Sequence, residues 1–297
     1  MKAKSIKGNT TAEIQTALRQ SIADRYEPTL AIIFLTNIEN AERIRSIFDK
    51  EGIAIFGAST SGKFSEHGIE TDDIVALLLD IPRDYFRIVL KDYHTTPPYE
   101  SARLVGETGM QAFNHPAFII SSSDISISGE DVINGLMDAA GHQVTIIGGM
   151  AGEQVNFTGI VFTNDSSSSN GLLALIIDKD KVEVNGLAVS GWKPVGTEKE
   201  ITKAEGIWVY SIDNEPAMSV IKKFLGKEIS FSKQTEGLVP VNIDFPLQVQ
   251  RESGTPMMRP VLLWNTADQS VMIGGGAKKG AKFRFSLPPD LDVIDTV

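Results

Sequence analysis

The 297-residue sequence contains no cysteine. Disulfide bonds, thiolate catalysis and Cys-ligated metal sites are therefore excluded, and a reducing cytoplasm is the simplest location for the chain. Histidine is also scarce, and its four copies are scattered without an H-x-x-x-H pair, so we expect no metal site. No segment approaches the roughly 18 consecutive apolar residues of a membrane span. The basic N-terminus lacks the apolar stretch of a secretory signal.

The chain has fewer basic than acidic side chains. The chain has 28 Lys and Arg against 38 Asp and Glu, which gives a formal net charge of −10. Nucleic acids and anionic membranes bind clustered basic side chains, so we expect neither as a main partner. Hydrophobic residues make up 42% of the chain, enough for a sizeable core. The length corresponds to two domains at roughly 150 residues each.

Two parts of the chain show the same order of predicted elements. In the first part, the apolar runs LAIIFL (30–35) and IAIF (53–56) predict strands on either side of a helix, and the second strand runs into GASTSG (57–62). In the second part, strands at 118–120 and 144–147 flank a helix, and the later strand runs into GGMAGE (148–153). Each part therefore predicts a strand, a helix, a strand and a Gly-rich turn.

The similarity continues beyond the turns. Gly148 follows Gly57 by 91 residues, and DIVALLLD (73–80) returns 98 residues later as GLLALIID (171–178). We interpret this pattern as an internal duplication, with halves at about 28–95 and 115–190. The fold class that follows is α/β plus α+β. A duplicated N-terminal α/β region with mixed sheets occupies residues 1–203, and a smaller domain with an antiparallel sheet and a helix occupies 204–297.

The segment GASTSGKF (57–64) resembles the phosphate-binding loop G-x-x-x-x-G-K-[S/T], with Phe64 at the Ser/Thr position. A phosphate loop depends on a helix that begins directly behind it. The following residues, FSEHGIETDD, show no helical period, and Phe64 cannot bind magnesium. We therefore do not expect nucleotide hydrolysis, and no cofactor is indicated.

The two Gly-rich turns are better explained as ends of strands where a ligand or another backbone approaches closely. Ser59, Thr60 and Ser61 add hydroxyl groups and amides suited to a carboxylate or a small polar molecule, and Gly149 and Met150 lie in the equivalent turn. The alternative is that the glycines serve only tight turns and close packing between the halves.

Three charged residues extend this candidate ligand site. Lys63 and Glu153 occupy similar places after the two turns, so Lys63 would meet the carboxylate of an amino acid and Glu153 its amine. Asp124, at the end of a predicted strand, could also bind an amine, although Asp is a common turn residue. His67 follows the first turn, and the simpler interpretation is an exposed loop histidine.

Several of these motifs, taken in order, resemble the FIST sensory domain. They are GASTSG, GGMAGE, GWKPVGTEKEITKAEG (191–206) and YSIDNEPA (210–217), and the resemblance runs from about Leu30 to about Gly280. It implies a cytoplasmic ligand-sensing module with N-terminal and C-terminal parts. It also implies a histidine kinase, chemoreceptor or cyclic-dinucleotide output domain as partner, and small ligands such as amino acids.

The sequence departs from the family pattern at two points. Ala58 stands where the family turn often has cysteine, and the C-terminal part usually extends beyond the end of this chain, so we expect that part to be incomplete. We predict a sensor rather than an enzyme. The alternative is a hydrolase or transferase that acts on a small polar metabolite through the Ser/Thr-rich turn.

Overall fold

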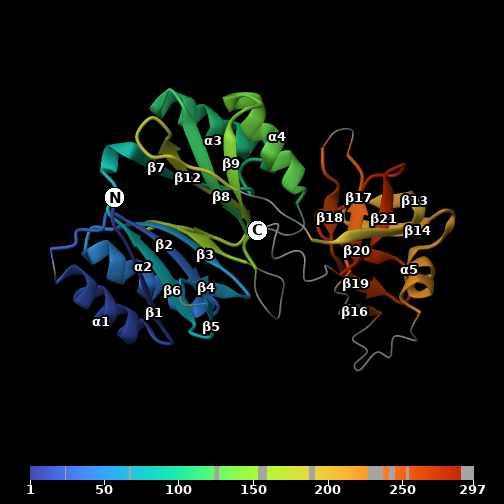
Figure 1. Ribbon diagram of the computed structural model, residues 1–297, viewed down its shortest axis with the longest axis horizontal. Coiled ribbons are helices and arrows are strands. Elements are labelled where there is room, and N and C mark those ends of the chain that lie inside the picture. Colours follow the sequence, from blue (N-terminus) through green and yellow to red (C-terminus); the bar gives the residue numbers. More distant parts are fainter. Residues whose placement is uncertain are drawn as a thin grey trace. The chain divides into compact units, whose positions relative to one another are not determined.

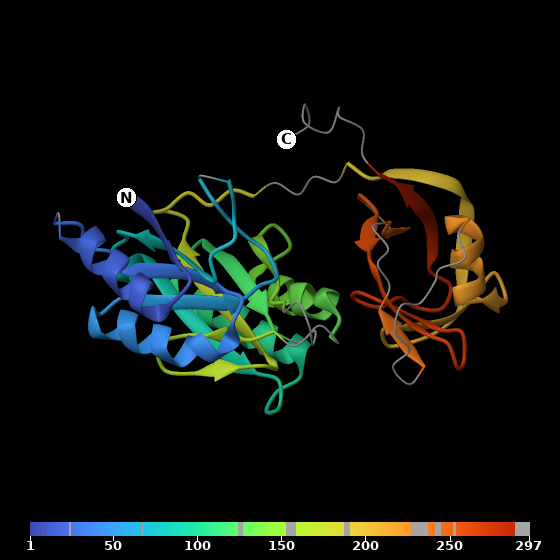
Figure 2. The ribbon, with the colours of Figure 1, turned by 90° about the horizontal axis from the view of Figure 1, so that it is seen from below.

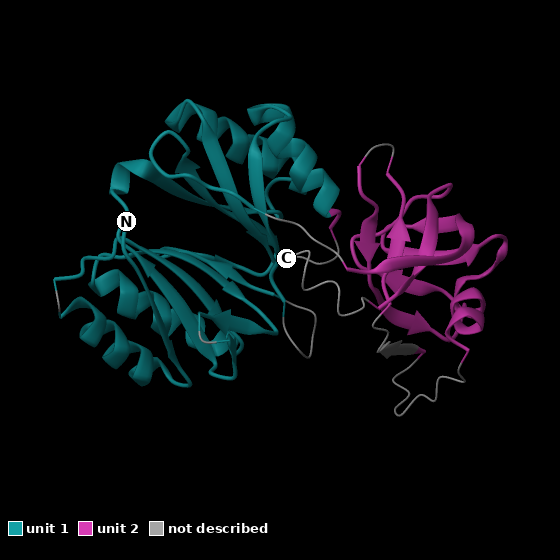
Figure 3. Ribbon diagram, viewed as in Figure 1, with its two compact units in different colours: residues 1–125, 129–186 teal, residues 126–128, 187–297 magenta. Residues whose placement is uncertain are grey.

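The computed structural model describes residues 1–23, 25–66, 68–123, 127–152, 159–186, 191–226, 237–240, 245–251 and 254–288. The chain forms two compact units (Figure 3). Unit 1 comprises Met1–Ile125 and Gly129–Gly186, and unit 2 comprises Ser126–Ser128 and Leu187–Val297. The domain boundary expected at 203/204 falls inside a single strand of unit 2, β13 (Lys193–Glu205).

Unit 1 contains two mixed sheets. Among the described residues, the first sheet has the order β1 (Ala3–Gly8), β6 (Ile74–Leu79), β2 (Leu30–Leu35), β3 (Ala54–Ser59), β10 (Val161–Phe162) and β11 (Ser167–Ser168). The second sheet has the order β7 (Phe86–Asp92), β12 (Gly171–Asp178), β8 (Pro116–Ser122) and β9 (Thr145–Met150). The pairs β2–β3 and β8–β9 are parallel, and the other neighbours are antiparallel.

Helices cover the outer face of each sheet, which makes unit 1 a four-layer structure (Figure 1). The first sheet carries α1 (Thr11–Ile22) and α2 (Ala41–Lys50), which lie side by side across it (Figure 2). The second sheet carries α3 (Pro98–Ala112) and α4 (Gly129–Ala140). Two short 3-10 helices, η1 (Ile38–Asn40) and η2 (Arg83–Tyr85), precede α2 and β7.

Alternating side chains of β2 explain why its sequence is wholly apolar. Ala31, Ile33 and Leu35 pack toward α1 and α2, whereas Leu30 belongs to the core between the two sheets. A strand that is covered on both faces needs apolar residues at successive positions. The apolar residues from Leu30 to Ile33 and Leu35 therefore follow from the four layers, whereas Phe34 is 38% exposed.

The two sheets of unit 1 repeat one strand order. Numbered along the chain, the four strands β1-β6-β2-β3 of the first sheet and the four strands β7-β12-β8-β9 of the second are both ordered 1-4-2-3 and have a parallel pair at 2-3. The repeated units therefore begin at β1 and β7, before the expected starts at about 28 and 115. Positions in β3 and β9 differ by 91 residues, since Ala54 and Thr145 begin the two strands. The repeated order agrees with the predicted internal duplication, but common topology does not establish common origin, so duplication stays a prediction.

Unit 2 contains a nearly closed antiparallel sheet and one helix in its described part. The long strand β13 pairs with β14 (Trp208–Ile212) through its C-terminal half and with β21 (Lys282–Leu287) through its N-terminal half. The helix α5 (Ala217–Leu225) ends at Gly226, which adopts the left-handed conformation at φ 64°. The remaining strands are β15 (Glu215–Pro216), β16 (Leu238–Pro240), β17 (Leu247–Val249), β18 (Met257–Arg259), β19 (Val261–Asn265) and β20 (Val271–Ile273).

The predicted fold class is confirmed, because a mixed α/β region is followed by a separate antiparallel sheet with a helix. The core of unit 2 is built from its own side chains, among them the fully buried Trp264 and Phe283. In the part of the chain that the structure describes, no helix has both the length and the apolar character needed to cross a membrane.

Candidate functional site

The loops that follow β3 and β9 contact each other. The amide of Gly152 donates a hydrogen bond of 3.1 Å to the carbonyl of Ser59, and the amide of Ala151 donates to the carbonyl of Ser122 at 2.7 Å. Ala151 is buried in the core between the sheets. The two Gly-rich turns therefore meet at one edge of unit 1, where parallel strands β2 and β3 end.

The place where the loops after β3 and β9 meet is called the corner below. Ser59 links the loop after β3 to the segment before β10. Its side chain is 1% exposed, and its hydroxyl accepts a hydrogen bond of 2.9 Å from the amide of Ile160. Its own amide donates to the Ile160 carbonyl at 2.9 Å. Gly57 lies nearby against Phe162, where any Cβ would overlap the ring. Close packing is thus the role of Gly57, which corresponds to the alternative interpretation of the glycines.

Thr60, Ser61 and Gly62 form the rest of the loop after β3. Thr60 donates its amide to the carbonyl of Leu35 at 2.9 Å, and its hydroxyl donates to the carbonyl of Gly62 at 2.8 Å. Ser61 and Gly62 are exposed at the tip. The hydroxyls of Ser59 and Thr60 contact backbone groups, and within the described residues neither contacts a histidine or a carboxylate.

Lys63 is the first residue of the short strand β4 (Lys63–Ser65), which forms a hairpin with β5 (Gly68–Glu70). A strand follows the loop directly, as expected from the absence of a helical period after GASTSGKF. Phe64 and Ile69 pair across the hairpin and are 82% and 91% exposed. Lys63 and Glu70 pair on the opposite face and are buried.

The ammonium group of Lys63 is almost enclosed. The residue is 8% exposed, and Nζ donates a hydrogen bond to the hydroxyl of Thr36, which directly follows β2. Within the residues that the structure describes, this neutral hydroxyl is its hydrogen-bond partner and no carboxylate forms an ion pair with it. Lys63 therefore supplies a buried positive charge to the corner.

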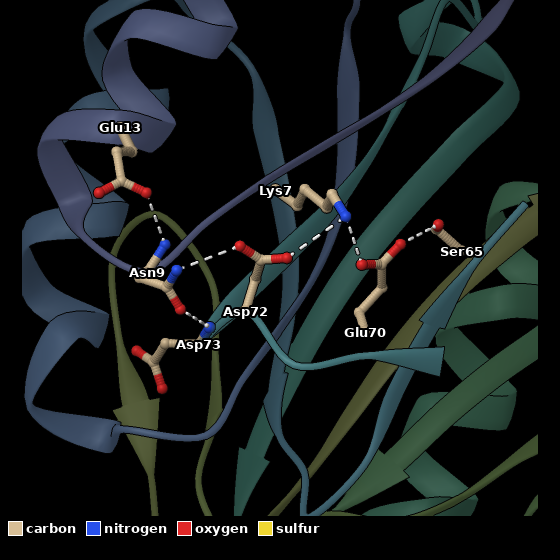
Figure 4. Close-up of polar contacts among 7 residues, drawn as sticks. All are labelled: Lys7, Asn9, Glu13, Ser65, Glu70, Asp72 and Asp73. Atoms are coloured by element: carbon tan, nitrogen blue, oxygen red, sulfur yellow. Dashed lines mark hydrogen bonds and ion pairs between the residues drawn. The ribbon is translucent and has the colours of Figure 1, made fainter. Parts of the chain in front are cut away.

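Glu70, opposite Lys63 on the hairpin, is bound by other residues (Figure 4). Its carboxylate contacts Nζ of Lys7 at 2.5 Å and accepts a hydrogen bond from the hydroxyl of Ser65. Lys7 also lies 3.4 Å from the carboxylate of Asp72. The hydrogen bond to Glu70 is the largest cause that raises the pKa of Lys7, with Asp72 adding to it. Lys7 therefore stays protonated and holds both acids.

The polar network continues along the same edge of the sheet (Figure 4). Asn9 donates its side-chain amide to Asp72 at 3.3 Å and accepts from the amide of Asp73 at 3.2 Å. The amide of Asn9 donates to Glu13 of α1 at 2.9 Å. The network thereby joins the ends of β1, α1, β6 and the β4–β5 hairpin. It fixes the surroundings of Lys63.

The second Gly-rich turn, at the end of β9, contributes exposed residues to the corner. Gly149 and Met150 are exposed, Met150 at 43%, and a Cβ on Gly149 would meet no atom within 4 Å. The strand beside them ends in buried serines, and the Ser122 hydroxyl lies 3.0 Å from that of Tyr93. Small and exposed groups thus form the rim on the side of the second sheet.

Three residues named from the sequence lie outside the described residues: Asp124, Glu153 and His67. The contact of Lys63 with Thr36 and that of Glu70 with Lys7 were missed because each joins residues far apart in sequence, and no local motif marks them. Among the described residues, no group of three or more His, Asp or Glu could hold a metal ion.

The comparison with protein families adds the decisive observation. The model of the FIST N domain matches residues 29–215, which is more than half of the chain. The chain belongs to the FIST family. FIST domains are sensory domains of signal transduction, and the resemblance seen in the sequence is confirmed. The comparison with curated proteins gives no match.

The matched FIST region has a clear place in the fold. It starts next to β2 and includes both corner loops, Lys63 and the whole second sheet of unit 1. It then continues into unit 2 as far as Glu215, through β13 and β14. Lys7 and Asn9, which organise the polar network beside Lys63, precede the matched FIST region.

Proposed function

We propose that this FIST chain senses a small polar metabolite that carries a carboxylate, with amino acids as the candidate class. The ligand binds at the corner where the loops after β3 and β9 meet, and its carboxylate pairs with Lys63. The observation that supports this proposal is the 8% exposed Lys63 side chain, whose ammonium has a neutral hydroxyl partner in the described part of the chain.

Burial of a charged group costs free energy. An ammonium group that leaves water loses several kcal/mol of hydration unless an opposite charge or several acceptors replace the water. The Thr36 hydroxyl provides one acceptor, and the nearby Glu70 carboxylate is bound by Lys7 and Ser65. A ligand carboxylate would supply the missing opposite charge in a charge-assisted hydrogen bond.

The rest of the corner suits a small ligand. Ser61, Gly62, Gly149 and Met150 are exposed around it, and small residues let a ligand approach the backbone closely. We expect Asp124 or Glu153 to bind an amino group, as the sequence suggests. Because the corner joins the two sheets, a bound ligand would favour the arrangement of the halves for which it has the higher affinity.

We also propose a cytoplasmic location and an output domain for this sensor. A cytoplasmic location agrees with the lack of cysteine. The ligand signal would pass to an output domain such as a histidine kinase, a chemoreceptor or a cyclic-dinucleotide enzyme.

The test is a thermal-shift screen with the amino acids and small organic acids, applied to the wild type, Lys63→Met and Lys50→Met. Methionine keeps the length and apolar stem of lysine, and exposed Lys50 of α2 is the matched control. We expect a saturable rise in Tm with a carboxylate ligand for the wild type and Lys50→Met. We expect Lys63→Met to lose this rise while its ligand-free Tm is equal or higher, because a buried unpaired charge is removed.

Two results would contradict the proposal. One is a ligand that stabilises Lys63→Met as strongly as the wild type. The other is a ligand that is converted during incubation, which chromatography of the recovered ligand would reveal and which would favour the hydrolase or transferase alternative. A sensor returns its ligand unchanged.

A further inference from the structure

A cleft of about 420 Å³ lies in unit 1 at the opposite end of β3 from the Lys63 corner. Its walls come from three segments: the start of β3 at Ala54 and Ile55, the stretch from η2 into β7, and the hairpin 163–166 between β10 and β11. The first and third segments belong to the first sheet and β7 to the second. The volume is within the range of roughly 300–1,000 Å³ that is usual for small-molecule sites.

Two arginines give this cleft a positive wall. Arg83 donates a hydrogen bond to the carbonyl of Gly52, and Arg87 donates to the carbonyls of Phe86 at 2.8 Å and Arg83 at 3.3 Å. All three acceptors are neutral carbonyl oxygens. The Arg87 guanidinium also lies 5.8 Å from the centre of the Phe113 ring. Across the described parts of the chain, no carboxylate forms an ion pair with either guanidinium group, and the acid that lines the cleft is the exposed Asp165.

The opposite wall is held rigidly. The side chain of Asn164 accepts a hydrogen bond of 2.9 Å from the amide of Ile55 and donates one of 2.9 Å to the carbonyl of Ile53. Arg45 of α2 donates to the carbonyls of Thr163 and Asn164, each at 2.9 Å. Arg45 of α2 and the backbone groups of Ile53 and Ile55 thus hold the hairpin, and a fixed site loses less conformational freedom when a ligand binds.

The floor of the cleft is apolar. Phe86 is buried, and Ile88 and Leu90 are partly buried against the core between the sheets. The Arg83 guanidinium lies 6.0 Å from the centre of the Phe86 ring. The apolar surface and the Arg83 guanidinium thus lie next to each other, with Arg87 also lining the cleft, and this combination suits a ligand with one apolar part and one anionic part.

We propose that this cleft binds an amphipathic organic anion. Its apolar body, of about the size of one aromatic ring, lies on Phe86, Ile88 and Leu90, and its carboxylate or phosphate group binds Arg83 and Arg87. The site is separate from the Lys63 corner, because Ala54 at the start of β3 lines the cleft and Ser59 at the end of β3 forms the corner. A ligand here contacts both sheets of the sensor and would act as a second input.

The test uses phenyl phosphate and benzoate as probes, titrated by calorimetry or by chemical-shift changes. Inorganic phosphate and benzyl alcohol are the controls that lack the ring or the charge. We expect saturable binding of at least one charged aromatic probe, and binding at least about tenfold weaker for both controls. The comparison of phenyl phosphate with benzoate tells which anion the arginine pair prefers.

Three variants locate the binding. Arg83→Gln combined with Arg87→Gln should weaken the charged aromatic probe by about tenfold or more, since two charge-assisted contacts are lost. Arg19→Gln, an exposed arginine of α1, is the matched control and should bind like the wild type. Ser166→Trp keeps both arginines but fills the mouth of the cleft, so it should also abolish binding. Circular dichroism checks that each variant is folded.

Several outcomes would overturn the proposal. They are the absence of saturable binding at about 10 mM probe, equal binding of inorganic phosphate and phenyl phosphate, or full binding by either the double arginine variant or Ser166→Trp. Lys63→Met should leave the affinity for the probes unchanged. A loss in that variant would place the probes at the corner and would also refute the separate cleft site.

Discussion

Replacement of Gly57 by alanine tests the packing between β3 and β10. A Cβ at position 57 would lie no more than 2.6 Å from three atoms of the Phe162 ring, whereas carbon atoms are ordinarily about 3.5 Å or more apart. The ring would have to retreat by about 1 Å. Phe162 is fully buried, so it can move only by displacing other core side chains. Overpacking of this kind costs about 1–3 kcal/mol, and we expect the upper part of that range.

Urea unfolding followed by far-UV circular dichroism measures this loss. Tryptophan fluorescence is unsuitable because all three tryptophans belong to unit 2. Gly149→Ala is the matched control, since its Cβ meets no atom within 4 Å, and it should change the free energy of unfolding by less than about 0.5 kcal/mol. Adding Phe162→Leu to Gly57→Ala should cost less than the sum of the single changes. A Gly57→Ala variant as stable as Gly149→Ala would refute the reasoning.

Three other substitutions test neighbouring parts of unit 1. Gly148→Ala should destabilise the chain by more than about 1 kcal/mol in urea unfolding, because Gly148 has φ 152° and its Cβ would strike the Ile120 carbonyl oxygen. Asn164→Ala leaves a buried amide without its acceptor, so a loss of about 1–3 kcal/mol is expected, and wild-type stability would contradict this. The hydrogen bond from Ser168 lowers the pKa of Asp92, and the hydrogen bond from the His94 amide adds to this effect. The ionised carboxylate therefore stabilises the fold at pH values above the ordinary Asp pKa of about 3.9. Asp92→Asn should therefore be less stable than the wild type at neutral pH, and an acid titration should show the two converge as the pH falls below that value.

The surroundings of Lys63 depend on the tertiary structure. The sequence identifies GASTSGKF as a loop without a following helix, and the structure confirms it by placing Lys63 in β4. It also suggests Lys63 as a carboxylate partner, which stays a prediction. The burial of its ammonium against Thr36 follows from the pairing of the hairpin and from the order of strands in the first sheet. No pattern of neighbouring residues encodes that contact.

The cleft with Arg83 and Arg87 is a second feature that no local sequence pattern reveals. Its walls come from residues 54–55, 83–90 and 163–166, and Thr163 follows Ala54 by 109 residues. Each segment by itself resembles an ordinary strand end or turn. The sequence by itself therefore indicates a candidate site only at the two Gly-rich turns.

By itself the sequence determined the local structure. Thr10-Thr11-Ala12-Glu13 has the T-x-x-E pattern of a capping box, and the Thr10 hydroxyl accepts from the Glu13 amide at 3.2 Å. LAIIFL forms a strand that is buried on both faces except at Phe34, and Gly226 ends α5 in the left-handed conformation. These features depend on residues within about four positions of each other, so the sequence pattern reveals them directly. The tertiary structure alone decided that Gly57 faces Phe162 and that two arginines share a cleft with the 163–166 hairpin. Those neighbours are brought together by strand order and sheet packing, which act between residues that are far apart in the chain.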